Sequence, residues 1–364
     1  MTLWGTYFSL AQLHRRKRKI SHERPPISVL KPLKGADSGL ETNLITFFHL
    51  DYPDYELLFC VAEESDPARE VAQRLMNRYP NTRAKLFIGE SLIGVNPKVN
   101  NLMVAYHEAK HDWILISDSN VRVPVNYLNT VTECLEPGVG AVTAVVAGVQ
   151  GKGIGGKLEV TFLNSFYARW MQIASAFGAP FIVGKSMLFQ KSTMERFGGI
   201  KNLGRYIAED YMAGQGIRRL GLRIKIMQEP IYQYIGDYSL KEFWLRHLRW
   251  GRIRKSQAPI AFFIEPWLGA LVSGGMGAWI VPECFGVSKA LFLAIHFGVW
   301  FLCDLAILVS FEKKLSLDCL WFWLLREILA FPLWLHIACG SHILWRGNRL
   351  QILPGGLVKV RAVA

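Results

Sequence analysis

The chain has 364 residues, of which 51% are hydrophobic and 20% charged, and its formal net charge is +13 at pH 7. This length is enough for one full α/β domain with an appendage. A positive charge of this size is typical of proteins that touch nucleic acid or anionic lipid headgroups. Because the apolar residues gather toward the C-terminal end and are not interleaved with the basic ones, we expect a membrane partner and no nucleic acid.

Residues 1–26 predict a short apolar segment followed by a basic linker. Met1 to Leu13 is apolar but too short to cross a bilayer. The basic run Arg15 to Lys19 follows it, whereas a cleavable signal peptide carries its charge ahead of the apolar run. We therefore expect a truncated anchor or an interfacial segment with a cytosolic basic flank.

Residues 27–260 alternate between short apolar runs and amphipathic stretches, which is typical of a parallel α/β sheet. Strands are predicted at residues 27–30, 55–62, 84–88 and 113–116, followed by a strand at 138–149 and a strand pair at 181–190. Helices are predicted at residues 40–48, 67–79, 98–109, 157–177 and 212–220. Four β/α repeats of this length predict a doubly wound, nucleotide-binding catalytic domain.

Residues 261–345 form the predicted membrane region, and residues 346–364 a basic tail. The stretch 266–282 has no charged residue, is short and is bounded by prolines, so we expect it to be re-entrant or to lie in the membrane plane. We expect crossings at roughly 288–311 and 317–345, which leave the tail on the cytosolic side with the catalytic domain. Asp304, His336 and the pair Arg326 and Glu327 lie in or beside these spans. We expect them to pair between the crossing helices, with contact to an acceptor headgroup as the alternative.

Acidic and polar side chains follow the second and fourth predicted strands, where ligands bind in a doubly wound sheet. Glu64 and Asp66 are expected to contact the base or ribose of a nucleotide. Asp118 and Asn120 are oxygen ligands that predict a divalent cation, Mn²⁺ or Mg²⁺, bridging a diphosphate, and Lys98 adds charge against phosphate. Each residue alone is also an ordinary turn or capping residue, so the prediction depends on the set.

Two motifs lie further along the chain. Asp210 precedes a predicted helix, and we expect it to be the base that takes the proton of an acceptor hydroxyl, with a helix N-cap as the alternative. Arg246 and Arg249 share one face of a helix and are placed to hold a diphosphate, while Trp250 is placed to stack on a sugar or a lipid. A basic interfacial helix explains the same pattern.

Taken in order, these motifs make the chain resemble the ceramide glucosyltransferases. They are KPLKG at 31–35, NPKVNNL at 96–102, DSN at 118–120, AEDY at 208–211 and RHLRW at 246–250. The resemblance implies a GT-A fold and transfer of glucose, with inversion, from a UDP-glucose donor to the primary hydroxyl of the lipid ceramide. It implies an active site built from three acidic motifs and an RxxRW motif, carried here by Asp66, Asp118, Asp210, Arg246, Arg249 and Trp250. It also adds Lys31, Pro32 and Glu209 to the residues expected to bind the nucleotide sugar.

Several alternatives remain open at this point. Glu64 competes with Asp66 for the uridine, because the first acidic motif reads Glu-Glu-Ser-Asp-Pro. Related bacterial enzymes use other lipids and sugars, such as hopanoids and N-acetylglucosamine. A polysaccharide synthase would need more membrane crossings, and a non-catalytic scaffold predicts loss of the acidic groups, which are all present.

Two patterns are interpreted as coincidental. Residues 107–111 read HExxH, but the predicted helix ends there, so we expect a polar helix surface and no zinc site. Residues 151–156 read GxGxxG, and we expect a glycine-hinged loop because no acidic strand end follows at the required distance.

Overall fold

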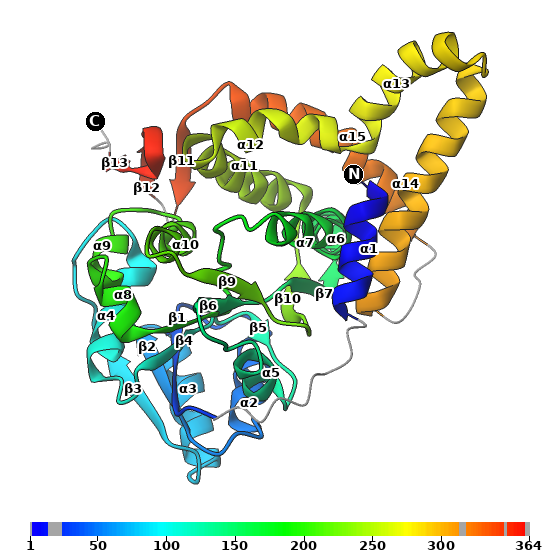
Figure 1. The fold of residues 1–364 in the computed structure, drawn as a ribbon. Helices are drawn as coiled ribbons and strands as arrows, with labels where there is room; N and C mark the ends of the chain where they lie inside the picture. Colours follow the sequence, from blue (N-terminus) through cyan, green and yellow to red (C-terminus); the bar gives the residue numbers. More distant parts are fainter. Residues whose placement is uncertain (1, 14–23, 313–317, 346–347, 361–364) are drawn as a thin grey trace. The chain divides into compact units, whose positions relative to one another are not determined.

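A computed structural model of the chain describes residues 2–13, 24–312, 318–345 and 348–360 (Figure 1). By compactness it divides into a sheet unit, Leu13–Ala147 with Ala174–Gly236, and a helical unit, Met1–Gln12 with Gly148–Ile173 and Asp237–Ala364. The basic run Arg15 to Lys19 and the tail residues Arg346 and Arg361 lie outside the described residues. The predicted domain boundaries at residues 26, 260 and 345 stay predictions.

A seven-stranded sheet forms the centre of the sheet unit, in the order β3-β2-β1-β4-β8-β6-β9. Its strands are β1 (Ile27–Leu33), β2 (Tyr55–Val61), β3 (Ala84–Ile88), β4 (Trp113–Ile116), β6 (Val139–Thr143), β8 (Met187–Gln190) and β9 (Arg223–Ile226). Strands β1 to β4 run parallel, and β8 is antiparallel to both of its neighbours. The strand order reverses at β1, which has β2 on one side and β4 on the other, and ligands bind beyond the carboxyl ends of the strands at such a reversal.

Helices cover both faces of this sheet (Figure 1). They are α2 (Leu40–Phe48), α3 (Ala68–Arg78), α4 (Pro97–Glu108), α5 (Tyr127–Thr132), α8 (Lys191–Glu195), α9 (Gly199–Leu203) and α10 (Glu209–Arg219). Leu58 and Cys60 of β2 pack in one hydrophobic cluster with residues of α4, α9 and α10. Phe59 between them points to the opposite face and stacks on Phe48 of α2, with ring centroids 5.8 Å apart. The predicted α/β sheet is therefore confirmed. Outside the large sheet, β5 (Val121–Arg122) pairs antiparallel with β10 (Ile231–Asp237).

The predicted strand pair at 181–190 is wrong in its first half. Only β8 is a strand, preceded by a single bridge between Val183 and Ser186. The chain turns back at Gly184, whose added Cβ would lie 2.9 Å from the Lys98 amine and 3.1 Å from an Asp210 oxygen. A glycine lets the backbone approach these charged side chains closely. The residues before β8 therefore form a turn against Lys98 and Asp210 and not a strand.

The helical unit is built mainly of helices. These are α1 (Thr2–Leu13), α6 (Gly153–Phe162), η1 (Leu163–Tyr167), α7 (Ala168–Ala176), α11 (Leu240–Gln257), α12 (Pro259–Ile264), η2 (Glu265–Leu268), α13 (Ala270–Phe285), α14 (Lys289–Glu312) and α15 (Cys319–Ala338). After them come the strands β11 (His342–Trp345), β12 (Asn348–Ile352) and β13 (Val358–Val360), with η3 (Pro354–Gly356) between the last two. The strand β7 (Val146–Lys152) carries the chain from the sheet unit into α6. The single helix predicted at 157–177 is three pieces, because a π-helical turn, η1, interrupts it.

The glycine-rich residues 151–156 do not form the expected loop. Gly151 and Lys152 end β7, and α6 begins at Gly153. A Cβ on Gly155 would lie 2.1 Å from the Ser239 carbonyl oxygen, and the Gly156 amide donates to the Tyr238 carbonyl oxygen at 3.1 Å. The glycines are therefore explained by the close packing of α6 against the chain that leads into α11.

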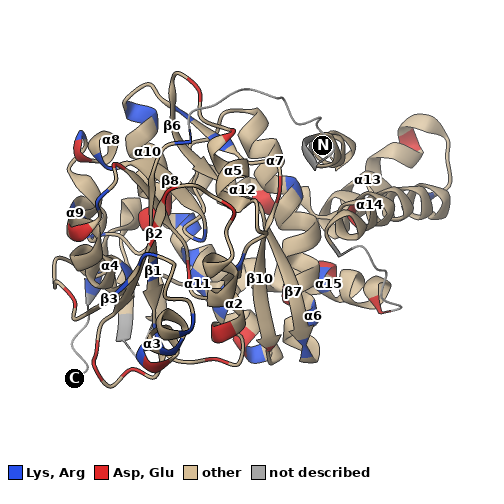
Figure 2. Cartoon of the chain, turned by 90° about the horizontal axis from the view of Figure 1, so that it is seen from below, with Lys and Arg blue, Asp and Glu red and all other residues tan. Residues whose placement is uncertain are grey.

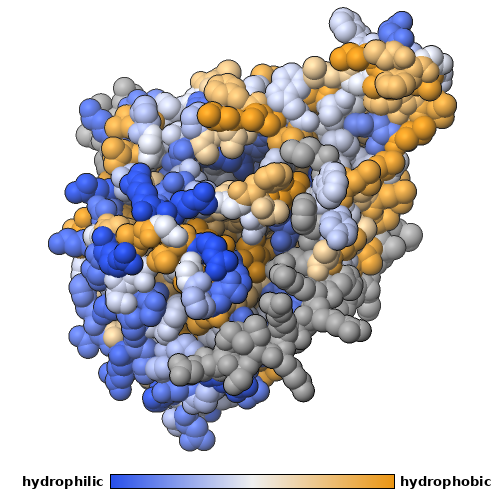
Figure 3. Space-filling view, in the orientation of Figure 1, coloured by the Kyte–Doolittle hydropathy of each residue, from blue (hydrophilic) through white to orange (hydrophobic). Residues whose placement is uncertain are grey.

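Two helices, α14 over Lys289–Phe311 and α15 over Cys319–Ala338, are long and apolar enough to cross a membrane. Figure 2 shows α13 and α14 mostly free of charged residues, and Figure 3 shows hydrophobic side chains gathered over the same hairpin. The segments Pro259–Leu268 and Ala270–Phe285 are bent by 65° at Gly269. This shape agrees with a re-entrant segment and equally with a broken span, so the predicted topology stays a prediction.

The second predicted crossing, 317–345, is too long at its C-terminal end. Helix α15 ends at Ala338, and residues 342–345 form β11. The Lys255 amine donates to the carbonyl oxygens of Ile337, Ala338 and Gly340 at 3.2, 2.9 and 2.6 Å. Lys255 thus satisfies carbonyl groups at the C-terminal end of α15. The helix ends there, although the apolar sequence continues beyond it.

Candidate active site

A buried lysine connects the ends of β1 and β4, where the strand order reverses. The Lys31 amine donates to the Asp118 carbonyl oxygen at 2.6 Å and to the Ser117 hydroxyl at 3.3 Å, and lies 3.8 Å from the centre of the Phe47 ring. Lys31 is fully buried, and this burial lowers its pKa well below the usual value. Lys31 therefore fixes the backbone that presents Asp118, and its predicted contact with a nucleotide sugar stays a prediction, as does that of Pro32 beside it.

The Lys98 amine collects the acidic residues of the site around itself. It lies 2.8 Å from an Asp118 oxygen and 2.9 Å from a Glu209 oxygen, and it donates to the Gly184 carbonyl oxygen at 2.9 Å. Burial alone would lower the pKa of Lys98, but the charges of Asp118 and Glu209 raise it above its usual value. Lys98 is the second residue of α4, and the side-chain amide of Asn96, the N-cap of this helix, also donates to Glu209 at 2.9 Å. The NPK motif thus joins the loop after β4 to the start of α10, although these lie far apart in the sequence.

Asp118 and Asn120 converge on a second ammonium group. The Lys185 amine lies 3.2 Å from an Asp118 oxygen and 3.0 Å from the Asn120 side-chain oxygen. Burial would raise the pKa of Asp118, but Lys98 and Lys185 together hold it well below its usual range. Two oxygens aimed at one cationic group are suited to a hard divalent cation, which in nucleotide sites keeps one or two protein ligands and takes the rest from phosphate and water. The residues predicted to hold a metal therefore fit one.

In the described ranges of the chain, no group of three or more His, Cys, Asp or Glu side chains is placed to hold a metal ion. The HExxH pattern is included in that result. Helix α4 ends at Glu108, so His107 and His111 do not share a helical face. The predicted end of the helix before His111 is confirmed, and the expectation that this pattern holds no zinc stays a prediction.

Backbone amides hold the Asp210 carboxylate in place. Asp210 is not the N-cap of its helix, which is Ala208. It is the second residue of α10, and its two oxygens accept from the Gly184 amide and the Tyr211 amide, both at 2.8 Å. Burial raises the pKa of Asp210, the neighbouring charge of Glu209 raises it further, and the result is about 6. A carboxyl group with this pKa is suited to accept a proton near neutral pH.

The first acidic motif separates into one residue tied to the backbone and two exposed ones. Asp66 accepts from the Gly35 amide at 2.9 and 3.1 Å and from the Ala68 amide at 2.9 Å. Glu63 and Glu64 are exposed, and Glu64 pairs with Arg69 at 3.4 Å. Asp66 therefore has the fixed position that recognition of a base requires, although its hydrogen bonds also explain it as a residue that joins the β1 loop to the start of α3.

The RxxRW motif lies in the helical unit, on α11. The Arg246 guanidinium lies 4.2 Å from the Trp250 ring centre, and its Nε is 3.1 Å from an oxygen of Glu159 on α6. The other Glu159 oxygen lies 2.7 Å from His247 Nε2. Glu159 is completely buried, so it orients Arg246 and His247 together. Arg249 lies on the same helix, and the predicted binding of a diphosphate by this motif stays a prediction.

The structure brings together Lys98, Asp118, Asn120, Glu209 and Asp210. Sequence reasoning missed Lys185, Gly184 and Glu159. Lys185 and Gly184 lie within the predicted strand pair at 181–190, and nothing in the local sequence indicates which distant side chains they contact. Glu159 is one polar residue in an otherwise ordinary helix, and only its position opposite α11 shows its contacts.

Comparison with known proteins shows the family to which the chain belongs. A family model described as Glycosyl transferase family 21 matches residues 1–358. The chain belongs to glycosyltransferase family 21. Ceramide glucosyltransferase 3 of Caenorhabditis elegans is 31% identical over 357 residues, which cover 96% of this chain and 78% of that protein. The ceramide glucosyltransferase of Komagataella phaffii is 27% identical, over 90% of this chain and 82% of that protein.

A solved structure supports the same fold. A mannosyltransferase from Pyrobaculum calidifontis, in complex with GDP-mannose and Mn²⁺, aligns over 93% of this chain and 92% of that chain, with a TM-score of 0.53 and 17% identity. The chain is therefore a glycosyltransferase of GT-A fold, as the motifs implied. The cluster around Lys98 lies at the position in the sheet where such folds bind ligands.

Proposed function

We propose that this family 21 glycosyltransferase transfers glucose from UDP-glucose to the primary hydroxyl of ceramide, with inversion at the anomeric carbon. The observation that carries the proposal is the convergence of Asp118, Glu209 and Asp210 on Lys98 at the strand-order reversal of the sheet. The relatives named ceramide glucosyltransferases support glucose as the transferred sugar and ceramide as the acceptor. Two helices able to cross a membrane support a lipid acceptor.

Asp210 acts as the base in this mechanism. Its carboxylate takes the proton of the acceptor hydroxyl while the hydroxyl oxygen attacks the anomeric carbon from the side opposite UDP. One carbon–oxygen bond forms as the bond to the diphosphate breaks, and UDP leaves with the electron pair. The Gly184 and Tyr211 amides hold the carboxylate in one orientation.

The positively charged residues of the cluster stabilise the leaving group. Lys98 and Lys185 are half-buried cations beside Asp118, and they offset the charge that grows on the diphosphate. A divalent cation, Mn²⁺ or Mg²⁺, held by Asp118 and Asn120, supplies Lewis-acid stabilisation of the same charge when bound. Asp66, with Glu64 as the exposed alternative, binds the uridine, and Arg246, Arg249 and Trp250 bind the remaining parts of the substrates. We place the catalytic residues on the cytosolic side, following the distribution of basic residues in the sequence.

Product analysis tests this function. Purified enzyme in detergent is given ceramide and, in separate reactions, UDP-glucose, UDP-galactose or UDP-N-acetylglucosamine, and the lipids are identified by mass spectrometry and by the NMR coupling of the anomeric proton. The expected product is β-glucosylceramide. A hexosylated product from another donor or lipid only, or retention of the α configuration, would show that the proposal is wrong.

A further inference from the structure

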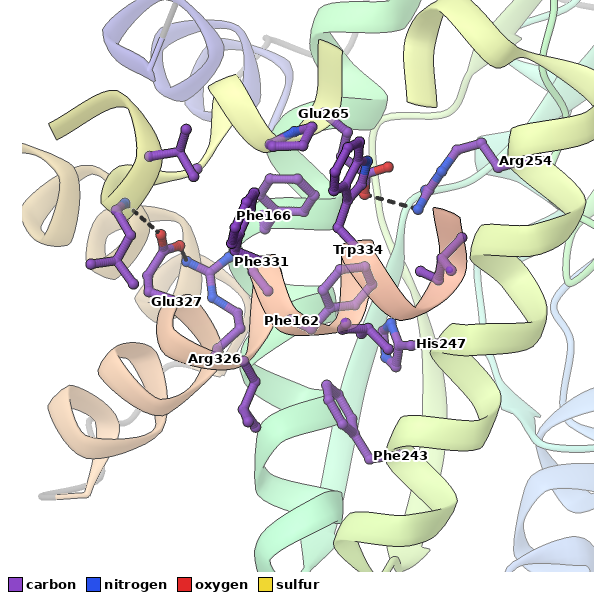
Figure 4. Close-up of a pocket in the computed structure, with 18 residues that line it drawn as sticks. Phe162, Phe166, Phe243, His247, Arg254, Glu265, Arg326, Glu327, Phe331 and Trp334 are labelled. Atoms are coloured by element: carbon purple, nitrogen blue, oxygen red, sulfur yellow. Dashed lines mark hydrogen bonds and ion pairs between the residues drawn. The ribbon is translucent and has the colours of Figure 1, made fainter. Parts of the chain in front are cut away.

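The helical unit contains a pocket with a cavity volume of about 90 Å³ between α6, α11, the bend before α13, and α15 (Figure 4). We call it the aromatic pocket because Phe162, Phe243, His247, Phe331 and Trp334 line it. His247 belongs to the RxxRW motif, and Glu159 holds its ring. The pocket is therefore directly connected to that motif through α11.

Charged groups lie at two sides of these rings (Figure 4). Arg326 and Glu327 of α15 lie at one side, and the pair Arg254 and Glu265, 2.8 Å apart, lies at the other. In the described part of the chain, some buried side-chain atoms have no hydrogen-bond partner, and three belong to these residues: Arg254 Nε, Arg326 Nε and Glu265 Oε2.

These three atoms specify the chemistry of an occupant. Two are donors and one is a carboxylate acceptor, and a buried polar atom left without a partner costs about 1–3 kcal/mol. A ligand that completes them offers oxygen acceptors together with an N–H or O–H donor. A secondary amide beside hydroxyl groups has both, whereas a fully esterified lipid has acceptors only.

The size of the pocket shows how much of a lipid it can hold. A cavity of about 90 Å³ is smaller than the engineered cavity of about 150 Å³ that admits benzene, so it takes a short part of a molecule and not a whole lipid. The adjoining segments α12 and η2 expose large apolar side chains, with Ile260, Phe263 and Trp267 exposed by 77, 57 and 51%. Alkyl chains can lie along such a surface while the polar part enters the pocket.

We propose that the aromatic pocket binds the amide- and hydroxyl-bearing part of the acceptor lipid. Arg326 and Arg254 donate to its oxygens, Glu265 accepts from its amide or hydroxyl hydrogen, and the aromatic rings pack against the first carbons of the chains. This proposal rests on the proposed function, because it identifies where that function's acceptor is recognised. It makes these residues determinants of lipid specificity and leaves the transfer chemistry to Asp210.

Filling the pocket tests this proposal. Ala330 of α15 lines the pocket and is exposed, so Ala330→Phe adds bulk without disturbing the core. Ala294→Phe is the matched control, because Ala294 is an exposed alanine on α14 that does not line the pocket. We expect Ala330→Phe to raise the KM for ceramide about tenfold or more, with the KM for UDP-glucose unchanged, and Ala294→Phe to change neither. An unchanged ceramide KM in Ala330→Phe would overturn the proposal.

The lipid's amide is tested with a second variant. The wild-type enzyme should prefer ceramide to diacylglycerol of equal chain length, and Glu265→Gln should reduce this kcat/KM ratio about fivefold, because a carboxylate accepts a stronger hydrogen bond than an amide oxygen does. The same ratio in the variant and the wild type would exclude Glu265 as the amide-reading group.

Direct labelling separates this proposal from the proposed function. A ceramide that carries a photoreactive diazirine near its amide should label peptides of α15 and of residues 259–272 in the wild type and in Ala294→Phe, but not in Ala330→Phe. Labelling elsewhere in the protein, or equal labelling in all three, contradicts the pocket. If labelling is as expected but no glucosylated lipid forms with UDP-glucose, the pocket stands as a lipid site and the proposed function fails.

Discussion

Both units bury a cluster of charges, but the two clusters differ in what they leave available to a ligand. In the sheet unit, the Asp118 side chain is 28% exposed and the Lys98 side chain 15%. In the helical unit, Asp304 is 1% exposed and bonds to Arg169, to Arg326 at 3.0 Å and to Trp323 Nε1 at 2.8 Å. Glu327 pairs with Arg326 and accepts from the first amides of α13, at 2.7 Å from Ala270. The pairing predicted for the charged residues of the crossing helices is confirmed.

The difference indicates that buried charge alone does not mark an active site. The helical cluster gives every carboxylate several protein partners, so it holds α7, α13, α14 and α15 together. The sheet cluster keeps exposed oxygens and raises the pKa of Asp210, which are properties of groups that act on a ligand. Substitutions in the two clusters should therefore affect different quantities.

The largest expected effect is that of Asp210→Asn on catalysis. The amide keeps an oxygen for the Gly184 N–H group but cannot take the acceptor proton, so kcat should fall by about 10²–10⁴-fold. Binding of UDP-glucose, measured by calorimetry, should change little. The melting temperature should fall modestly, because the Asn NH2 group faces the Tyr211 amide in place of an accepting oxygen. Wild-type turnover in this variant would remove Asp210 from the role of base.

Next in size is the effect of Asp304→Ala on stability. Removing this carboxylate leaves Arg169 and Arg326 buried without their shared partner, which costs about 3–5 kcal/mol in comparable buried pairs. Thermal unfolding in detergent should show a clear loss, and kcat per folded molecule at saturating ceramide should remain, whereas the KM for ceramide should rise because Asp304 positions Arg326 at the aromatic pocket. Loss of turnover at unchanged stability would mean that this cluster, too, is part of the active site.

A smaller effect is expected when Lys185 is changed to Met. The Lys185 amine occupies the position between Asp118 and Asn120, so a divalent cation must displace it. The variant should bind Mn²⁺ about tenfold more tightly, which corresponds to roughly 1.4 kcal/mol. Titration of the Mn²⁺ EPR signal measures this without turnover, and Lys191→Met, in a lysine away from the cluster, is the control. Weaker Mn²⁺ binding in Lys185→Met would show that the lysine assists the cation.

The mildest change is the pH dependence of kcat/KM. Because the pKa of Asp210 is raised to about 6, the carboxyl group is protonated below that pH and cannot act as a base. The rate should therefore be level above about pH 6 and fall about tenfold for each unit below it. A midpoint near the usual aspartate value of about 4 would contradict the environment described for Asp210.

Most strands and helices of the fold could be predicted from the sequence, because they depend on the pattern of neighbouring residues. Strands such as Tyr55–Val61 are buried on both faces, so they appear as continuous apolar runs, and the predicted bounds agree closely. The errors lie where a distant contact decides the structure: at Gly184, where the chain must approach Lys98 and Asp210, and at α15, which ends where Lys255 binds its last carbonyl groups.

The sequence by itself determined the α/β pattern, the apolar spans and the acidic residues at the strand ends, because periodicity, composition and motif order are properties of neighbouring residues. Only the tertiary structure decided which charges meet. Lys98, Lys185 and Asp210 are far apart in the chain and come within bonding distance of a common set of atoms because the sheet order places their strand ends and helix starts together. Burial, hydrogen bonding and neighbouring charge, which set the pKa of Asp210, exist only after that assembly.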